Sequence, residues 1–289
     1  MSIIKKLYKD GHLSISQSFA TDTHYEVIMG STAYGANSED NKSDMDIHAI
    51  CTPPLEYVFP WLSGWIPDFD NRPQNFENFQ QHHIKAYEKD YDVAIYSTIR
   101  TFRLAAENNP NILDMLWVPD NCITHIDGVG HHIRRNRKLF LHKGSLHRFL
   151  GYAHQQMKRL KTSNRVELIE KYGYDTKFAY HIVRLSLQVE QILEKHDMDF
   201  SANAPFIKEV RKGAFKTAEE LEAWYREKEV HLNALYHTST LRHSPDMAQL
   251  KEVLMACLEM KYGSLEKVYK GAESDVFRKL EEIKRIVNS

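Results

Sequence analysis

The stretch from Val27 to Ile50 constrains the fold of this chain more than any other. A short apolar run from Val27 to Met29 ends at Gly30-Ser31, and a polar spacer of twelve residues leads to Asp44-Met45-Asp46-Ile47. Successive side chains of a strand point to opposite faces, so Asp44 and Asp46 are predicted to project side by side. The stretch therefore predicts two strands joined by a polar loop, with glycine at one end and paired acids at the other.

These residue types point to phosphate chemistry. Two neighbouring carboxylates repel each other unless a cation lies between them, and oxygen ligands of this kind suit Mg²⁺. Gly30 lets the backbone approach a ligand closely. Ser31 is expected at the start of a short helix, where backbone N–H groups attract phosphate. We therefore expect a phosphate cradle beside a metal site, the alternative being an acidic hairpin loop without a ligand.

This order of motifs resembles the signature of the DNA polymerase β-like nucleotidyltransferases, in which Gly-Ser is followed after about a dozen residues by Asp-x-Asp. The resemblance implies that Gly30 and Ser31 hold a nucleoside triphosphate. It also implies that Asp44 and Asp46 bind two Mg²⁺ ions, with Mn²⁺ as a possible substitute. A third carboxylate on a later strand is implied as well.

The third carboxylate is sought in the run Tyr91 to Tyr96, whose aromatic and β-branched residues predict a strand. Asp92 is preferred because it lies inside the apolar run, where a carboxylate needs a partner such as a metal. Asp90, on the same strand face, is its rival, and Glu88 is a weaker one. The adjacent pair His82-His83 is assigned no site, because neighbouring side chains point in different directions.

Size and composition favour an ordinary globular protein. The 289 residues suggest two domains or one large one, and 42% hydrophobic with 27% charged residues is typical of soluble proteins. We see neither a signal peptide nor an apolar run near the ~20 residues of a membrane span. Cys51, Cys122 and Cys257 lack metal-type spacing. A cytoplasmic protein with reduced cysteines is expected, and its oligomeric state cannot be inferred.

The distribution of predicted strands and helices divides the chain near residue 125. Strands are expected at 25–29, 44–50 and 91–96, with an irregular insertion at 55–80 between them. Helical periodicity begins after Ser97 and continues to the C-terminus, the later helices being expected at 131–141, 145–162, 165–171, 175–195, 204–212, 217–237, 246–260 and 272–287. The predicted fold is α+β: a nucleotidyltransferase catalytic domain at 1–125, with a small mixed sheet, and an all-helical substrate-binding domain at 126–289.

Positive charge is concentrated in one part of the helical half. Between Gly128 and Val166 there are ten Lys or Arg residues and no Asp or Glu. A surface of this kind favours a phosphate backbone. This basic block is therefore predicted to bind nucleic acid, although a basic face balanced by acidic neighbours in the fold would look the same. Its members are Arg134, Arg135, Arg137, Lys138, Lys143, Arg148, Lys158, Arg159, Lys161 and Arg165.

A second group of basic residues lies on one helix. Lys177, His181 and Arg184 are spaced i, i+4 and i+7 and share a face. Three stacked cations repel one another unless an anion meets them, so we predict that they bind the triphosphate, an RNA phosphate being a second possible anion. Pairing with Asp175, Glu190 or another acidic helix is the alternative.

Four segments sharpen the resemblance: GSTAYGANSEDNKSDMD, DVAIYS followed by NNPNILDMLW, GYDTKFAYHIVRL, and the turn Arg211-Lys212-Gly213. Over about 25–265 the chain resembles predicted nucleotidyltransferases of bacteria and phages, some of them linked to RNA repair. That family often has His near Phe178, so Phe makes this position structural here. A polymerase β-like palm with a helical C-terminal domain is implied.

The predicted function is Mg²⁺-dependent transfer of a nucleoside monophosphate from a nucleoside triphosphate to an acceptor hydroxyl. The expected acceptor is an RNA end of tRNA type. One alternative keeps the chemistry and modifies a protein hydroxyl, as AMPylating antitoxin-like relatives do. Another is a non-catalytic protein that binds nucleic acid. The base, template dependence and biological pathway cannot be read from the sequence.

Overall fold

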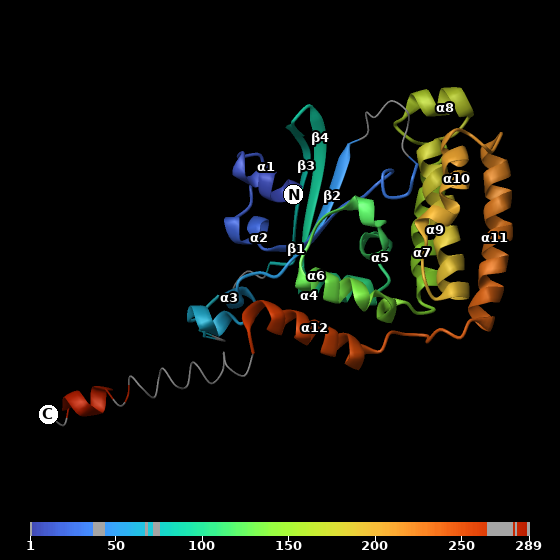
Figure 1. Cartoon of the computed structure of the whole chain (residues 1–289). Coiled ribbons are helices and arrows are strands. Elements are labelled where there is room, and N and C mark those ends of the chain that lie inside the picture. The colour runs from blue at the N-terminus through green and yellow to red at the C-terminus, as the bar shows by residue number, and fades with distance from the viewer. Residues whose placement is uncertain are drawn as a thin grey trace.

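The computed structural model describes residues 2–36, 44–66, 69–71, 76–264, 280 and 282–287. Its centre is a mixed sheet whose described strands follow the order β3-β4-β2-β1-β5 (Figure 1). β2 and β4 are parallel, and the other neighbours are antiparallel. The strands are β1 (Thr23–Ile28), β2 (Met45–Cys51), β3 (Asn78–Ala86), β4 (Lys89–Ser97) and β5 (Ile123–Ile126).

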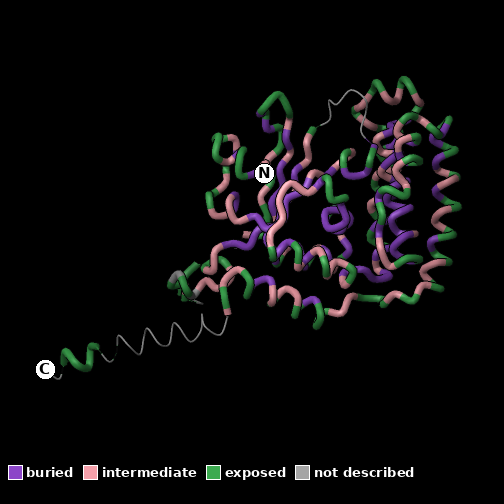
Figure 2. The backbone as a smooth tube through the Cα atoms, in the orientation of Figure 1, coloured by how far each residue is buried: buried purple, intermediate pink, exposed green. Residues whose placement is uncertain are grey.

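Helices cover both faces of this sheet (Figure 1). On one face, α1 (Ile3–Lys9) and α2 (Gln17–Thr21) form a core with residues such as Ile47 and Ile95. The other face packs against α4 (Thr98–Ala106), α5 (Pro110–Trp117) and α6 (Gly128–Arg135). The buried parts of the tube run through the sheet and continue into the helices beyond it (Figure 2). Both faces of the central strands are therefore largely covered, and β1 buries the polar residues Thr23, His24 and Glu26 beside its apolar ones.

The C-terminal helices form a bundle around α9 (Thr176–Lys195), which contacts α7 (Ser145–Arg159), α10 (Phe200–Arg211) and α11 (Ala218–Thr238). α8 (Val166–Tyr172) precedes α9, and α12 (Met247–Tyr262) returns to pack against α4 and α6. None of the helices in the described part of the chain has the length and apolar character needed to cross a membrane. The shorter elements are α3 (Leu55–Val58), η1 (Pro60–Ser63), η2 (Asp120–Cys122) and η3 (Arg137–Phe140).

The start of α9 is fixed by Asp175. Its carboxylate accepts hydrogen bonds from the backbone N–H groups of Lys177 at 2.7 Å and Phe178 at 3.3 Å. An N-cap of this kind satisfies donors that have no partner within the helix. Buried residues such as Ile182 and Val189 then anchor the helix in the core. As a result, the side chain of Lys177 is held in the first turn of a rigid element.

The predicted α+β fold class is confirmed, but two strands were missed. β3 is a sheet edge rich in Asn, Gln and His, with a register shift between Gln81 and Ile84, so it lacks a clean alternation. β5 has four residues and is only half-buried. Edge strands need fewer apolar residues than central ones, which weakens their signal in the sequence.

Three further details concern the predicted boundaries. The helix expected at Ser31 is a series of turns instead, and the spacer residues 37–43 lie outside the described part. Of the predicted helix 272–287, residues 282–287 are helical and 272–279 are not described. The division near residue 125 stays a prediction. Its position falls inside β5, and α12 reaches back to the sheet half.

Candidate active site

Gly30 and Asp46 are in direct contact where β1 ends beside β2. The N–H of Met29 donates to the carbonyl oxygen of Asp46 at 2.8 Å. Gly30 has φ +70°, and a Cβ built on it would lie 2.3 Å from Asp46 Oδ2. Because a side chain at this position would occupy the place of the carboxylate, both the backbone conformation and the space available favour glycine at residue 30.

Asp92 lies beside Asp46 in the sheet. β2 and β4 are parallel and pair these two residues, so their side chains project from the same face. Ile50 and Tyr96, farther along the same strands, pack from that face against the core formed with the helices. Asp44, exposed immediately before β2, is among the charges that act on Asp46. The structure thus brings together the three predicted carboxylates, at the end of the sheet that carries the Gly30 turn.

Asp92 is held by the irregular part of β3. The backbone N–H of His83 donates to Asp92 Oδ1 at 2.8 Å, and His82 Nδ1 lies 3.3 Å from Oδ2. His83 has φ +56°, and the register shift between β3 and β4 occurs here. Bulges commonly redirect groups near active sites. The role of His82-His83 was not predicted from the sequence, because one of the two residues acts through its backbone N–H.

Asp90 occupies a different position from Asp92. It pairs with Lys85 of the edge strand β3 and is not among the main charges acting on Asp46. Glu88 lies in the β3–β4 turn with φ +60°. Of the three acidic residues considered for the third carboxylate, Asp92 is therefore the one next to Asp46.

The turn after Gly30 is tightly bonded and presents Ser31 at its start. The N–H groups of Ala33 and Tyr34 donate to the Gly30 carbonyl at 3.1 and 3.4 Å, and Ala36 donates to the Ser31 carbonyl at 2.8 Å. Ser31 itself is partly exposed. The turn provides one helical turn of backbone instead of a full helix, with Ser31 at the end nearest Asp46.

A buried polar network fixes this turn to the helices. The Tyr34 hydroxyl donates to Asp114 Oδ2 at 2.6 Å, and Gln188 Nε2 donates to Oδ1 at 2.7 Å. Arg184 forms an ion pair with the same carboxylate, and its guanidinium lies 4.2 Å from the centre of the Tyr34 ring. Asp114 is fully buried. These contacts tie the turn to α5 and α9 at once.

Basic side chains of the helical part lie opposite the carboxylates. Lys177 is within electrostatic range of Asp46 and Asp44 on one side, and of Arg165 and Arg211 on the other. The guanidinium of Arg211 lies 5.4 Å from the centre of the Tyr180 ring, and within the described residues it has no ion-pair partner. The site therefore has an acidic wall on the sheet and a basic wall on the helices.

Burial and like charges shift the pKa values on both walls. Burial, followed by the neighbouring Asp92 carboxylate, raises the pKa of Asp46. Burial, with Arg165 and Arg211, lowers the pKa of Lys177. Burial next to these cations also lowers the pKa of His181 well below its usual value, so His181 is neutral at pH 7. Like charges repel one another within each wall. A ligand that carries a cation and phosphates would reduce the repulsion in both, because the cation would lie against the carboxylates and the phosphates against the basic side chains.

Residues 9–255 match the family described as the RNA repair pathway DNA polymerase beta family. The chain belongs to the RNA repair pathway DNA polymerase beta family. No curated protein matches the sequence. A crystal structure of a nucleotidyltransferase-like protein from Exiguobacterium sibiricum 255-15 is 12% identical, over 81% of this chain and 73% of that one, with a TM-score of 0.30.

Membership of this family confirms the predicted polymerase β-like resemblance. It does not by itself assign roles to residues, and two predicted groups have unexpected surroundings. Arg184, expected at the triphosphate, is buried and engaged by Asp114. Its partner Asp114 was not recognised, because it lies 70 residues away on a different helix.

The basic block is partly neutralised within the fold. Arg134 bonds the Val118 carbonyl at 2.8 Å and Asp120 at 3.0 Å, and Lys138 pairs with Asp197 at 2.6 Å. Arg137 bonds the carbonyl of Arg134 and packs over Trp117. Arg135 is exposed. Nucleic-acid binding by these four residues stays a prediction, and acidic neighbours already use part of the charge that suggested it.

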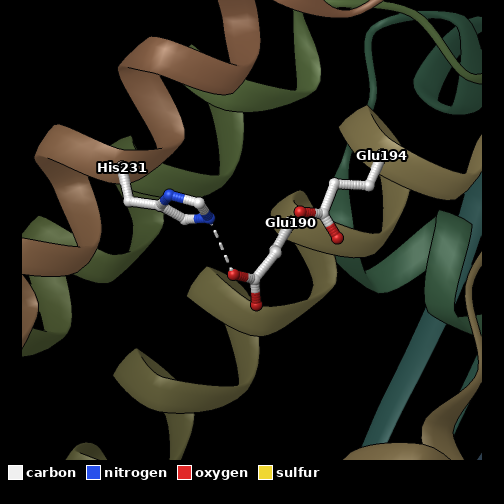
Figure 3. A group of neighbouring side chains, drawn as sticks. All are labelled: Glu190, Glu194 and His231. Atoms are coloured by element: carbon white, nitrogen blue, oxygen red, sulfur yellow. Dashed lines mark ion pairs between the residues drawn. The ribbon is translucent and has the colours of Figure 1, made fainter.

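A second cluster that could hold a metal ion lies elsewhere in the bundle. Glu190 and Glu194 of α9 approach His231 of α11 (Figure 3). His231 Nε2 lies 3.1 Å from Glu190 Oε1, and Lys228 Nζ lies 2.7 Å from the same oxygen. Thirteen residues of helix, roughly 20 Å, separate Glu190 from Lys177. The cluster is thus an ion-pair network distinct from the candidate active site.

Proposed function

We propose that this protein transfers a nucleoside monophosphate from a nucleoside triphosphate to an acceptor hydroxyl. The observation that carries the proposal is the pairing of Asp46 with Asp92 beside the Gly30 turn, opposite the basic wall. Membership of a polymerase β family agrees with this chemistry. A half-buried pair of acids without such a use would be a cost to the fold.

The carboxylates fit divalent metal ions. Asp44, Asp46 and Asp92 offer oxygen ligands only, which suits Mg²⁺ and also Mn²⁺. Burial, followed by the neighbouring Asp92 carboxylate, raises the pKa of Asp46, so a cation at this position would stabilise its ionised form. We propose that these three residues hold two Mg²⁺ ions. When bound, such ions activate the attacking hydroxyl and stabilise the charge on the leaving pyrophosphate.

The other residues of the site would bind and orient the nucleotide. Gly30 admits the phosphates because it has no side chain, and Ser31 supplies a hydroxyl and an N–H group. Lys177 and Arg211 would contact the triphosphate from the helices through charge-assisted hydrogen bonds. His181, being neutral, can donate or accept one hydrogen bond without adding charge. Arg184 would act indirectly, by holding Tyr34 and the turn in place.

His82 and His83 would orient Asp92. Both oxygens of Asp92 are engaged from β3, which limits rotation of the carboxylate. Fixed orientation of metal ligands by surrounding hydrogen bonds typically contributes 10- to 100-fold to metal affinity or activity. This edge strand is therefore part of the proposed site.

We propose RNA as the acceptor, on the strength of the family's connection with RNA repair. Arg165, at the end of the basic block, lies within range of Lys177. Its Nη1 donates to Asp175 Oδ2 at 2.6 Å, and its partly exposed guanidinium retains further N–H donors for an RNA phosphate beside the site. The basic block gives less support than the sequence suggested, since part of its charge is paired. A protein hydroxyl is therefore kept as an outcome of the test.

The test follows a phosphate label placed at one of two positions in the nucleoside triphosphate. The protein is incubated with Mg²⁺, tRNA and each nucleoside triphosphate, labelled at either the α- or the γ-phosphate. The α-label should enter RNA and the γ-label should leave with pyrophosphate, and Asp46→Asn should abolish both results. Label on a polypeptide would identify a protein acceptor instead. Transfer of the γ-label, or no transfer to any acceptor, would refute nucleotidyl transfer to RNA.

A further inference from the structure

A pocket of about 550 Å³ lies behind the Gly30 turn. Thr32 and the three residues after it form one wall, α10 forms the opposite wall, and Pro119 with Asn121 closes the side. The turn and α10 approach closely here, since a Cβ on Gly35 would lie 3.1 Å from the Cβ of Ala204. None of the residues predicted from the sequence for the active site lines this pocket.

The pocket adjoins the proposed phosphate cradle. Thr32 lines it, and Thr32 follows Ser31 directly in the chain. Consecutive Cα atoms are about 3.8 Å apart, so the rim of the pocket is one residue away from the proposed phosphate-binding position. A nucleotide with phosphates at Ser31 has its ribose and base within reach of this space.

The chemistry of the lining suits a nucleoside. Phe200 and Pro119 supply apolar surface, and the volume falls in the range of small-molecule sites, about 300–1,000 Å³. Asn121 makes no side-chain hydrogen bond to any described residue, and its carboxamide offers both a donor and an acceptor to a base edge. A purely apolar ligand would make no hydrogen bond with this carboxamide.

Two further polar groups suit different parts of a nucleotide. Ser201 donates its hydroxyl to Asp199 Oδ1 at 2.6 Å, so its oxygen remains able to accept a hydrogen bond from a ribose hydroxyl or a base N–H. Lys208 lines the pocket and has no ion pair with the residues described. An unpaired ammonium beside an apolar cavity favours an anionic group at the edge of the ligand.

We propose that this pocket binds the base and ribose of a nucleotide, with Lys208 near a phosphate. The inference rests on the proposed function, since it takes the Gly30 turn as the phosphate cradle. Two sources share this chemistry: the incoming nucleoside triphosphate and the terminal nucleoside of the RNA acceptor. Both place a nucleoside next to the carboxylates.

The experiment measures equilibrium binding by the full-length protein, without turnover. The probes are ATP, GTP, CTP, UTP, inorganic tripolyphosphate, and a short RNA with either a normal or an abasic 3′-terminal nucleotide. Asn121→Ala and Lys208→Ala are compared with Asn111→Ala and Lys251→Ala, exposed residues outside the pocket. Thermal melts check that the four surface variants remain folded.

If the pocket holds the base of the triphosphate, Asn121→Ala should weaken the binding of at least one nucleoside triphosphate by about fivefold or more. Tripolyphosphate binding should not change in that variant. If it holds the RNA end, triphosphate binding is unchanged and the advantage of the normal RNA over the abasic one disappears. Lys208→Ala should weaken the same ligand, and both control variants should match the wild type.

The pocket proposal is overturned if Asn121→Ala and Lys208→Ala bind every probe as the controls do. It is also overturned if the wild-type protein does not distinguish nucleoside triphosphates from tripolyphosphate, nor normal from abasic RNA. Failure of the proposed function would look different. In that case nucleotides bind and respond to Asn121→Ala, but no label is transferred.

Discussion

The contact between Gly30 and Asp46 allows a sharp test of the candidate active site. Gly30→Ala introduces one methyl group at φ +70°, with its Cβ 2.3 Å from Asp46 Oδ2. Ordinary contacts begin at 3.4 Å, so the carboxylate oxygen must move by about 1.1 Å. The short side chain of Asp46 can rotate away, which limits the loss of stability but displaces the proposed metal ligand.

The substitution is expected to change the free energy of unfolding and the catalytic efficiency by different amounts. A non-glycine residue in the left-handed region costs about 1–2 kcal/mol. A displacement of about 1 Å at reacting groups can lower activity by about 100-fold. Gly30→Ala should therefore lose about 100-fold in kcat/KM while the free energy of unfolding falls by only about 1–2 kcal/mol.

Two other glycines provide matched controls. Gly11 has φ +80° and Gly64 has φ +87°, and an added Cβ would meet no described atom within 4 Å at either position. Their alanine variants should lose similar stability to Gly30→Ala in denaturant unfolding, yet keep kcat/KM within a few-fold of wild type. Near-normal turnover in Gly30→Ala would refute the assignment of Asp46. An equal loss in Gly11→Ala and Gly64→Ala would attribute the effect to the left-handed backbone conformation and not to Asp46.

Three other predictions concern acidic residues. Asp46→Asn should raise the Tm of the metal-free protein at pH 7, because the folded-state pKa is raised and ionisation of Asp46 costs stability as the pH rises through it. The gain should vanish below the unfolded pKa of about 3.9, and a lower Tm at pH 7 would contradict this reasoning. Asp92→Asn should abolish transfer and Asp90→Asn should not, whereas the opposite result would move the third ligand to Asp90. Asp114→Ala should cost about 3–5 kcal/mol in denaturant unfolding by leaving Arg184 buried without its partner, and a loss under 1 kcal/mol would show that the network is unimportant for stability.

The signals that the sequence carried most clearly were local. Gly30-Ser31 and Asp44-x-Asp46 sit at the ends of central strands, where apolar burial on both faces produces an obvious run. The preference for Asp92 also came from such a run, because a carboxylate within buried residues needs a partner. The α+β class followed from the change of period after Ser97.

Tertiary structure determined which charged side chains meet each other. Arg184 and Lys177 share a helix and a charge, yet Arg184 meets Asp114 in the core and Lys177 faces Asp46 across the site. His82-His83 contribute to the site because an irregular edge strand turns a backbone N–H toward Asp92. Spacing along a helix or strand determines which side chains share a face. What that face meets depends on packing between elements distant in sequence, so only the folded chain reveals which charges are free to bind a ligand.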